Sequence, residues 1–394
     1  MKKTLKTLAV ILTLILLLCA CGKTKGTESK PSNDKDNVSS YSDSSVSDDV
    51  SSEADDLSGS DTSDDDYLDL DLSDDKENNN DDSDEEDDEE EEEYIIPPYI
   101  QEYEDTGIHN PVKVLTPAEM IEKCIKDGLK VKETVIKIGL NKPVKIARIT
   151  DSHLAYVNGA DNAIAREQAS IRYQYYVDAD KKLSRCVNYA KASGVDLVAF
   201  TGDIWDFFSM GNLYKFSQAT KVLDDFLFSI GNHEDIRKVG GNLSTGDDFT
   251  LLRNTISQYV KGDLSFDTRD LGEVTVVSMD NSRYTFDANQ VEKMKAEIAK
   301  GKPILIMMHV PLYTDELFEV AKENNDTGSI MGKTMTGATK EMVELINDNP
   351  DIIKGIFAGH LHYDHTSETT GGITQHLLRA SVQEKGFIEI IEVK

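Results

Sequence analysis

Histidine, aspartate and asparagine residues recur in this chain directly after short apolar segments. Five of its eight histidines occupy such positions. The blocks are, in chain order, Asp151-Ser152-His153, Gly202-Asp203-Ile204-Trp205-Asp206, Gly231-Asn232-His233-Glu234, His309 and Gly359-His360-Leu361-His362. Carboxylate, imidazole and amide donors suit Mn, Fe or Zn better than Ca²⁺, which prefers oxygen alone. The residue types therefore predict metal-dependent chemistry.

Seven side chains of these blocks are candidate metal ligands: Asp151, His153, Asp203, Asn232, His309, His360 and His362. Seven donors are too many for one ion of ordinary coordination number, but they suit two ions that share a bridging carboxylate. Two divalent ions about 3.5–4 Å apart are the standard arrangement for in-line displacement at phosphorus. We therefore expect two divalent ions, with Mn, Fe or Zn favoured, and a small phosphate ester as substrate.

The apolar segments that precede these blocks read as buried strands of an α/β protein. Strands are predicted over 144–149, 195–201, 226–230, 274–279, 303–308, 355–358 and 386–393. Helices are predicted after a capping box at Thr116 and over 178–193, 287–300 and 340–347. Strands that alternate with helices and are apolar on both faces indicate buried sheets. Ligands bind at the carboxyl ends of such strands, so the blocks should meet at one edge.

Taken together and in this order, the blocks resemble the motifs of the calcineurin-like metallophosphoesterase superfamily. The resemblance covers about Val144 to the C-terminus. It implies a four-layer α/β sandwich of two mixed β-sheets flanked by α-helices. It also implies that phosphate mono- or diesters are hydrolysed by attack of a hydroxide that bridges the two metals.

The family pattern also implies a role for each residue. The first ion would be bound by Asp151, His153 and His362. The second would be bound by Asn232, His309 and His360, and Asp203 would bridge both ions. His233 would protonate the leaving oxygen, and Glu234 would orient and polarise His233. Asp206 would accept a hydrogen bond from a metal-binding histidine.

Other interpretations of the same blocks lead to different functions. Asp151 and Asp203 could cap helices, and Gly231-Asn232 could form a turn. The alternative function is a non-catalytic surface protein that binds a phosphorylated envelope component through a metal-stabilised fold. A binder has no use for a general acid, so His233 and Glu234 favour an enzyme. A purely structural protein would leave the seven donors unexplained.

The N-terminus has the pattern of a secretory signal over residues 1–20. Three lysines precede an apolar run from Leu8 to Leu18, which is shorter than the roughly 20 residues of a membrane-spanning helix. The run ends in Leu18-Cys19-Ala20-Cys21-Gly22, which resembles a bacterial lipobox. We expect Cys21 to be lipidated, so that its diacylglyceryl group holds the protein on the cell membrane, facing outside the cytoplasm.

Residues 21–93 are predicted to form a disordered acidic spacer. The chain of 394 residues has a net charge of −31, yet residues 34–93 alone hold 29 acidic residues against two lysines. Such a segment cannot bury enough apolar surface to fold. With +5 on residues 1–33, a charge of −9 is left for the predicted phosphoesterase domain, residues 94–394 with a core of about 144–394. The acidity makes double-stranded nucleic acid an unexpected partner.

Two further features leave alternatives open. Cys124 and Cys186 are either buried thiols or a disulfide. The segment from Leu154 to Arg172 contains Arg166 and Arg172 and is either a lid over the site or the start of an ordinary helix.

Overall fold

Two β-sheets form the centre of the fold, which we describe from a computed structural model over residues 97–101, 114–234 and 249–394. The first sheet has five strands in the spatial order β2 (Lys130–Ile136), β13 (Phe387–Val393), β3 (Val144–Ile149), β5 (Leu197–Thr201) and β6 (Leu227–Ser229). β3, β5 and β6 run parallel to one another, whereas β13 is antiparallel to β3. The sheet is therefore mixed.

The second sheet has six strands, and it is also mixed. Its spatial order is β11 (His365–Glu368), β12 (Thr374–Leu377), β10 (Ile353–Ala358), β9 (Ile304–Met307), β8 (Thr275–Met279) and β7 (Phe266–Asp270). The four central strands are parallel neighbours, and the two edge strands pair antiparallel with them. A separate parallel pair joins β1 (Ile100–Gln101) to β4 (Val157–Asn158).

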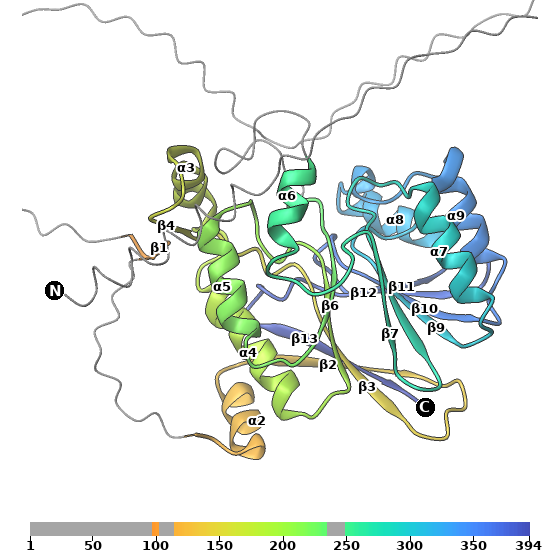
Figure 1. The fold of residues 1–394 in the computed structure, drawn as a ribbon, viewed down its shortest axis with the longest axis horizontal. Coiled ribbons are helices and arrows are strands. Elements are labelled where there is room, and N and C mark those ends of the chain that lie inside the picture. Colours follow the sequence, from red (N-terminus) through yellow and green to blue (C-terminus); the bar gives the residue numbers. More distant parts are fainter. Residues whose placement is uncertain (1–96, 102–113, 235–248) are drawn as a thin grey trace, which may run out of the picture. The chain divides into compact units, whose positions relative to one another are not determined.

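Helices cover the outer face of each sheet (Figure 1). Against the five-stranded sheet pack α2 (Pro117–Lys126), α4 (Ala179–Ala192), α5 (Met210–Thr220) and α6 (Phe249–Ile256). Against the six-stranded sheet pack α7 (Ala288–Ile298) and α9 (Gly337–Asn347). The remaining helical elements are α3 (Ala163–Arg172), α8 (Asp315–Glu323) and the short η2 (Thr327–Ser329). The predicted α/β fold of two mixed sheets flanked by helices is confirmed.

The space between the two sheets is filled by apolar side chains of both. Ile146 and Ala199 from the first sheet share a buried cluster with Leu305, Met307 and Phe357 from the second. Successive residues of a strand point to opposite faces, so Ala147, next to Ile146, packs instead against the helices. This explains why the central strands are apolar throughout.

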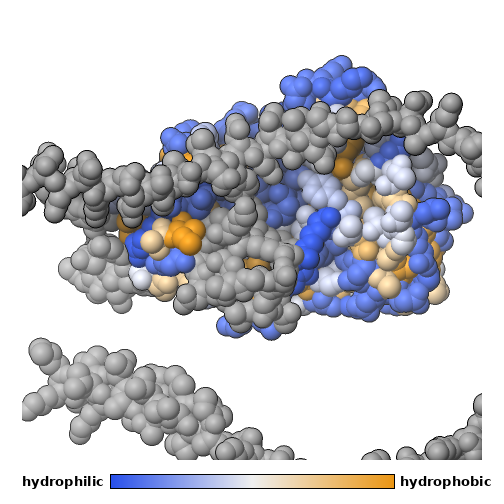
Figure 2. Space-filling view, turned by 90° about the horizontal axis from the view of Figure 1, so that it is seen from above, coloured by the Kyte–Doolittle hydropathy of each residue, from blue (hydrophilic) through white to orange (hydrophobic). Residues whose placement is uncertain are grey.

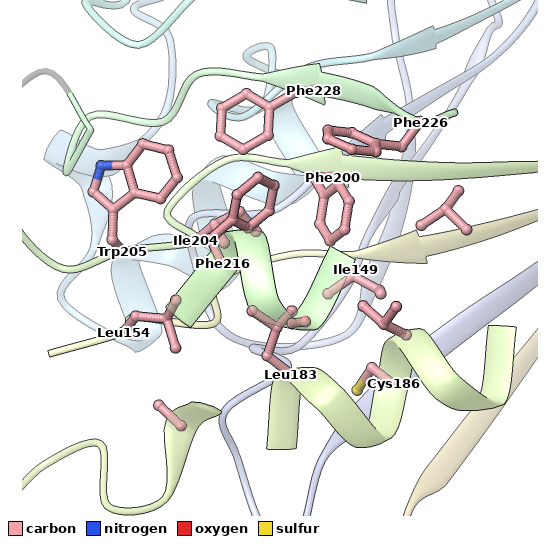
Figure 3. Close-up of a cluster of buried hydrophobic side chains, with 14 of the residues drawn as sticks. Ile149, Leu154, Leu183, Cys186, Phe200, Ile204, Trp205, Phe216, Phe226 and Phe228 are labelled. Carbon is pink, nitrogen blue, oxygen red and sulfur yellow. The ribbon is translucent and has the colours of Figure 1, made fainter. Parts of the chain in front are cut away.

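Aromatic side chains form the core between β5, β6 and α5 (Figure 3). Phe200 of β5 contacts Phe216 of α5 and Phe228 of β6, with ring centroids 5.3 and 6.3 Å apart. Trp205 stacks on Phe228 at 5.5 Å. Trp205 and its neighbour Ile204 are fully buried, so they anchor the loop that carries Asp203 and Asp206.

Most predicted elements are present with slightly shorter bounds. The capping box at Thr116 begins α2, with Thr116 and Glu119 satisfying each other's backbone N–H groups. The helix predicted over 178–193 is α4, and that predicted over 287–300 is α7. Several elements were not predicted from the sequence: α5, α6, α8, η2, β1, β2, β4, β7, β11 and β12. Cys124 and Cys186 are both buried and free, which decides against a disulfide.

The described surface has exposed apolar side chains at scattered places. In the view of Figure 2, hydrophilic residues separate small apolar groups. None of the described helices is long and apolar enough to cross a membrane. The predicted signal (1–20), the lipidation site Cys21 and the spacer (21–93) lie outside the described residues and stay predictions.

Candidate active site

The carboxyl ends of five strands, from both sheets, meet at the predicted site. They are β3, β5 and β6 of the first sheet and β9 and β10 of the second. Contacts cross from sheet to sheet: the backbone N–H of His360 donates to the Asp151 carboxylate at 3.1 Å, and His309 Nδ1 donates to the Thr201 carbonyl at 2.8 Å. The structure thus brings the five sequence blocks together.

Asp151, His153 and His362 form the first group of side chains that can hold a metal. One donor atom of each lies within 4.8 Å of the others. His153 Nε2 is 3.0 Å from His362 Nε2, which is 3.4 Å from Asp151 Oδ1. His153 Nδ1 lies 3.0 Å from Asp206 Oδ1. Because an ionised carboxylate only accepts, Nδ1 carries the hydrogen and the lone pair of a neutral His153 is on Nε2.

Asp203, His309 and His360 form the second group, and Asn232 lies beside it. Their donor atoms are again within 4.8 Å of one another. His309 Nε2 is 3.1 Å from Asp203 Oδ2, 3.0 Å from Asn232 Oδ1 and 3.1 Å from His360 Nδ1. All seven predicted ligands therefore lie in one cluster, and their roles as ligands stay predictions.

The donor arrangement fits divalent cations. His309 Nδ1 donates to a carbonyl, so a neutral ring turns the lone pair of Nε2 toward the oxygens of Asp203 and Asn232. Acceptors this close repel one another unless a proton or a cation lies among them. Oxygen and imidazole donors without a thiolate match Mn, Fe or Zn.

The electrostatics of the site favour positive charge. Burial lowers the pKa of His309, but the Asp203 charge and hydrogen bond outweigh burial and raise this pKa to about 10. Burial also opposes ionisation of Asp203, yet the surrounding imidazoles, His309 first, hold the pKa of its carboxyl well below the usual range. Divalent ions would take the place of the His309 proton and lower its pKa.

Asp203 lies close to donor atoms of both groups, and with His153 and His233 it forms a third set of donors that lie within 4.8 Å of one another. Its Oδ2 contacts His309 Nε2 at 3.1 Å and lies 4.0 Å from His153 Nε2. Its Oδ1 accepts a hydrogen bond from the backbone N–H of His233 at 3.0 Å. Among the seven predicted ligands, Asp203 is therefore placed between the two groups, as a bridging carboxylate must be.

His233 lies at the rim of the cluster with one ring nitrogen fixed. Its Nδ1 donates to the main-chain carbonyl of Asp206 at 2.8 Å and lies 3.3 Å from Asp206 Oδ1. Burial lowers the pKa of His233, but the charges of Asp203 and Asp206 more than offset burial and raise the pKa. With Nδ1 engaged, Nε2 is the atom that can exchange a proton with a substrate.

The predicted role of Glu234 is wrong. The Glu234 carboxylate accepts hydrogen bonds at 2.6–3.2 Å from four backbone N–H groups, those of Gly231, Asp203, Ile204 and Trp205. Burial, followed by repulsion from Asp203, raises the pKa of Glu234 to about 7. Glu234 therefore joins the two loops that carry the ligands, and the group that orients His233 is Asp206. Asp206 also receives the predicted histidine hydrogen bond, from His153.

Two glycines of the blocks are needed for close approach. A Cβ at Gly231 would lie 2.1 Å from Asp203 Oδ1. A Cβ at Gly359 would lie 2.0 Å from Thr150 Oγ1 and 2.4 Å from Asp151 Oδ2. Each glycine therefore lets a ligand carboxylate pass directly over the neighbouring loop.

Five predicted ligands have a left-handed backbone: Asp151, His153, Asp203, His360 and His362, with φ between 43° and 74°. This conformation costs about 1–3 kcal/mol per residue and clusters at functional sites. Backbone hydrogen bonds hold it in place, for example from Asp151 N–H to the Gly202 carbonyl and from His153 N–H to the Asp203 carbonyl, both at 2.9 Å.

Two residues of the loop after β8 also support the site, and neither was predicted from the sequence. The Tyr284 hydroxyl is 2.8 Å from His360 Nε2. Asn281 Oδ1 accepts hydrogen bonds from the backbone N–H groups of His309 and Val310 at 3.1 and 3.0 Å. A signal was present, because this loop also follows a predicted apolar strand.

The comparison with protein families identifies the class. The calcineurin-like phosphoesterase family matches residues 144–364, more than half of the chain. The chain therefore belongs to the calcineurin-like phosphoesterase family and is a metal-dependent phosphoesterase. No curated protein matches its sequence.

Several solved structures are similar to this chain. A dimetal phosphatase from Danio rerio is 13% identical, with a TM-score of 0.39; the similarity covers 60% of this chain and 87% of that one. A phosphopantetheinyl hydrolase from Mycobacterium tuberculosis is 11% identical, with a TM-score of 0.36 and coverages of 61% and 91%. A 5'-nucleotidase from Candida albicans is 14% identical, with a TM-score of 0.33 and coverages of 63% and 48%, so this chain spans about half of it.

Proposed function

We propose that this chain hydrolyses small phosphate mono- or diesters outside the cytoplasm while a lipid on Cys21 holds it to the membrane. The observation that supports the hydrolase most directly is that seven oxygen and nitrogen donors meet beside His233. A non-catalytic binder would need the donors but not an imidazole held for proton transfer.

In the proposed site, each of the two groups of donors binds one ion. Asp151, His153 and His362 would hold one ion, Asn232, His309 and His360 the other, with Asp203 between them. Bound divalent ions, Mn, Fe or Zn, would supply a nucleophile from water near neutral pH and offset the charge of the phosphate. Asn232 is neutral, so it keeps the site more positive toward an anionic ester than a carboxylate would.

The proposal is tested by assaying the full chain with p-nitrophenyl phosphate and its bis-ester, each with Mn²⁺, Fe²⁺ or Zn²⁺. We expect multiple turnovers with at least one metal and one ester, and loss of activity on chelation. Stoichiometric binding of the esters without turnover would instead favour the non-catalytic surface protein.

Replacing His233 with glutamine should slow hydrolysis most for esters with poor leaving groups. General acid catalysis contributes about 10²- to 10⁴-fold, and an alkoxide needs the proton more than p-nitrophenolate does. We therefore expect kcat to fall by about that factor for an alkyl phosphate and by less for p-nitrophenyl phosphate. His365→Gln, outside the donor groups, serves as the control. Equal losses for both esters would contradict the role of His233 as the acid.

The membrane anchor predicts that Cys21→Ala releases the protein from membranes. Without the thiol no diacylglyceryl thioether can form, and the anchoring energy of two acyl chains is lost. We expect wild type in the membrane fraction and labelled by a clickable fatty acid, and Cys21→Ala unlabelled. Cys19→Ala, two residues earlier, is the matched control and should behave like wild type. Equal labelling of both variants would contradict lipidation at Cys21.

A further inference from the structure

Arg172, the last residue of α3, donates two hydrogen bonds to the Asp206 carboxylate. Arg172 Nε donates to Asp206 Oδ2 at 2.6 Å, and Nη2 donates to Asp206 Oδ1 at 2.9 Å. A guanidinium that engages both carboxylate oxygens fixes the plane of the carboxylate as well as its position. Arg172 therefore sets the orientation of Asp206, whose side chain is almost fully buried.

Asp206 in turn contacts both His153, a proposed metal ligand, and His233, the proposed general acid. Its Oδ1 accepts from His153 Nδ1 at 3.0 Å and lies 3.3 Å from His233 Nδ1. The first contact keeps the hydrogen of His153 on Nδ1 and leaves Nε2 for a metal. The second contact is with Nδ1 of His233, the proposed acid. A rotation of this carboxylate would disturb both histidines at once.

Tyr176 extends the same arrangement to the face of His153. Its ring stacks on the His153 ring with centroids 4.5 Å apart and an interplanar angle of 9°. The Arg172 guanidinium lies 5.5 Å from the Tyr176 ring centroid, and Nη2 is 3.3 Å from the Tyr176 hydroxyl. His153 is thus held at its edge by Asp206 and on its face by Tyr176, and both contact Arg172.

We propose that Arg172 is a positioning residue of the active site, acting through Asp206 on the metal-binding His153 and the acid His233. This inference rests on the proposed function, because it uses the roles given there to both histidines. Of the two alternatives for this segment, a lid or the start of an ordinary helix, the contacts of Arg172 with Asp206 and Tyr176 favour the helix, with its last arginine turned toward the site.

A matched control lies on the same helix. Arg166 of α3 donates to the backbone carbonyls of Asn158 and Asp161, at 2.9 and 3.3 Å, and belongs to neither donor group. A variant at Arg166 therefore tests the effect of losing an arginine from α3 without losing the contact to Asp206.

The experiment compares full-length wild type, Arg172→Gln, Arg172→Lys and Arg166→Gln. Loss of a group that orients a metal ligand typically costs about 10- to 100-fold in metal affinity or activity. For Arg172→Gln we expect the affinity for Mn²⁺ alone and the kcat of the metal-loaded protein to fall by about that factor, with KM unchanged. Lysine cannot donate to both carboxylate oxygens in one plane, so Arg172→Lys should keep only part of the Mn²⁺ affinity and the kcat of wild type. Arg166→Gln should match wild type.

Chemical rescue separates positioning from general stability. Methylguanidinium added to Arg172→Ala should restore part of the kcat, because a free guanidinium can occupy the same contact with Asp206. A raised KM with unchanged kcat would assign Arg172 to the substrate instead. Unchanged Mn²⁺ affinity in Arg172→Gln would overturn the inference even if wild type hydrolysed no ester, so the two proposals fail separately.

Discussion

Replacing Asp203 with asparagine is expected to lower kcat/KM for a phosphate ester by about a thousand-fold or more, which corresponds to ~4 kcal/mol of transition-state stabilisation. Asp203 contacts His309 Nε2 at 3.1 Å and lies 4.0 Å from His153 Nε2, so its charge acts on both groups of donors. Asparagine keeps the shape but removes that charge and one of the two oxygens that could bind cations. We expect the bound Mn²⁺ per chain to fall in parallel, as measured by elemental analysis.

The control for Asp203 is a carboxylate that is engaged elsewhere. Asp180 accepts from the Tyr156 hydroxyl at 2.6 Å and pairs with Lys215 at 2.5 Å, and it belongs to neither group of donors. Asp180→Asn should therefore bind Mn²⁺ and turn over like wild type. If Asp203→Asn kept both its metal content and its activity within about tenfold of wild type, a bridging role would be untenable, because outer groups alone have effects of that size.

The predicted ligands could be expected to lie together because strand geometry limits where their side chains can be. A side chain that directly follows a buried parallel strand must emerge at the carboxyl edge of the sheet. This holds for Asp151 after β3, Asp203 after β5 and His309 after β9. Gly231 and Gly359 could have given a second signal, because the structure shows that a Cβ at either position would collide with a carboxylate of the site.

The direction in which a side chain points could not be predicted from the motifs, so the role of Glu234 could not be predicted either. The resemblance to the family implied that Glu234, the residue after His233, orients this histidine. The Glu234 carboxylate instead points toward four backbone N–H groups, because buried donors must be paired. The group that does contact His233 is Asp206, 27 residues earlier in the chain.

The elements that the sequence analysis missed depend on contacts between distant segments. β2 (Lys130–Ile136) is an edge strand without buried residues, so it lacks the apolar run that marks β5. The sequence leaves α3 open as a lid or the start of a helix, because the helix buries only Ala165 and Ala169 and its helical pattern is weak. Arg172 acts on Asp206, 34 residues away, and no local pattern specifies that pairing.

The largest effect on stability is expected from the buried ion pair between Arg148 and Glu389. Both side chains are fully buried, with Arg148 Nε and Nη2 each 2.7 Å from Glu389 Oε2. Arg148 Nη1 also donates to the carbonyls of Ala358 and His376, at 2.9 and 3.0 Å. The pair therefore joins β3 and β13 of one sheet to β10 and β12 of the other, directly behind the strand ends that carry Asp151 and His360.

Removing one partner of this pair leaves a buried charge without compensation. Burial already lowers the pKa of Arg148 against the opposing effect of Glu389. We expect Glu389→Leu to reduce the free energy of unfolding by about 3–5 kcal/mol, measured by urea denaturation. The exposed pair of Lys322 with Glu319 is the control, and Lys322→Gln should leave the urea midpoint unchanged.

The double variant Arg148→Met with Glu389→Leu distinguishes the cost of an unpaired charge from loss of packing. Two apolar side chains of similar volume remove both charges at once, and such replacements are often neutral or stabilising. We therefore expect the double variant to recover most of the stability that Glu389→Leu loses. If it were as unstable as the single variant, the hydrogen bonds from Arg148 to Ala358 and His376, which only the double variant loses, would stabilise the protein as much as removing the unpaired charge does. The alignment of the strand ends at the active site would then depend on hydrogen bonding rather than on charge compensation.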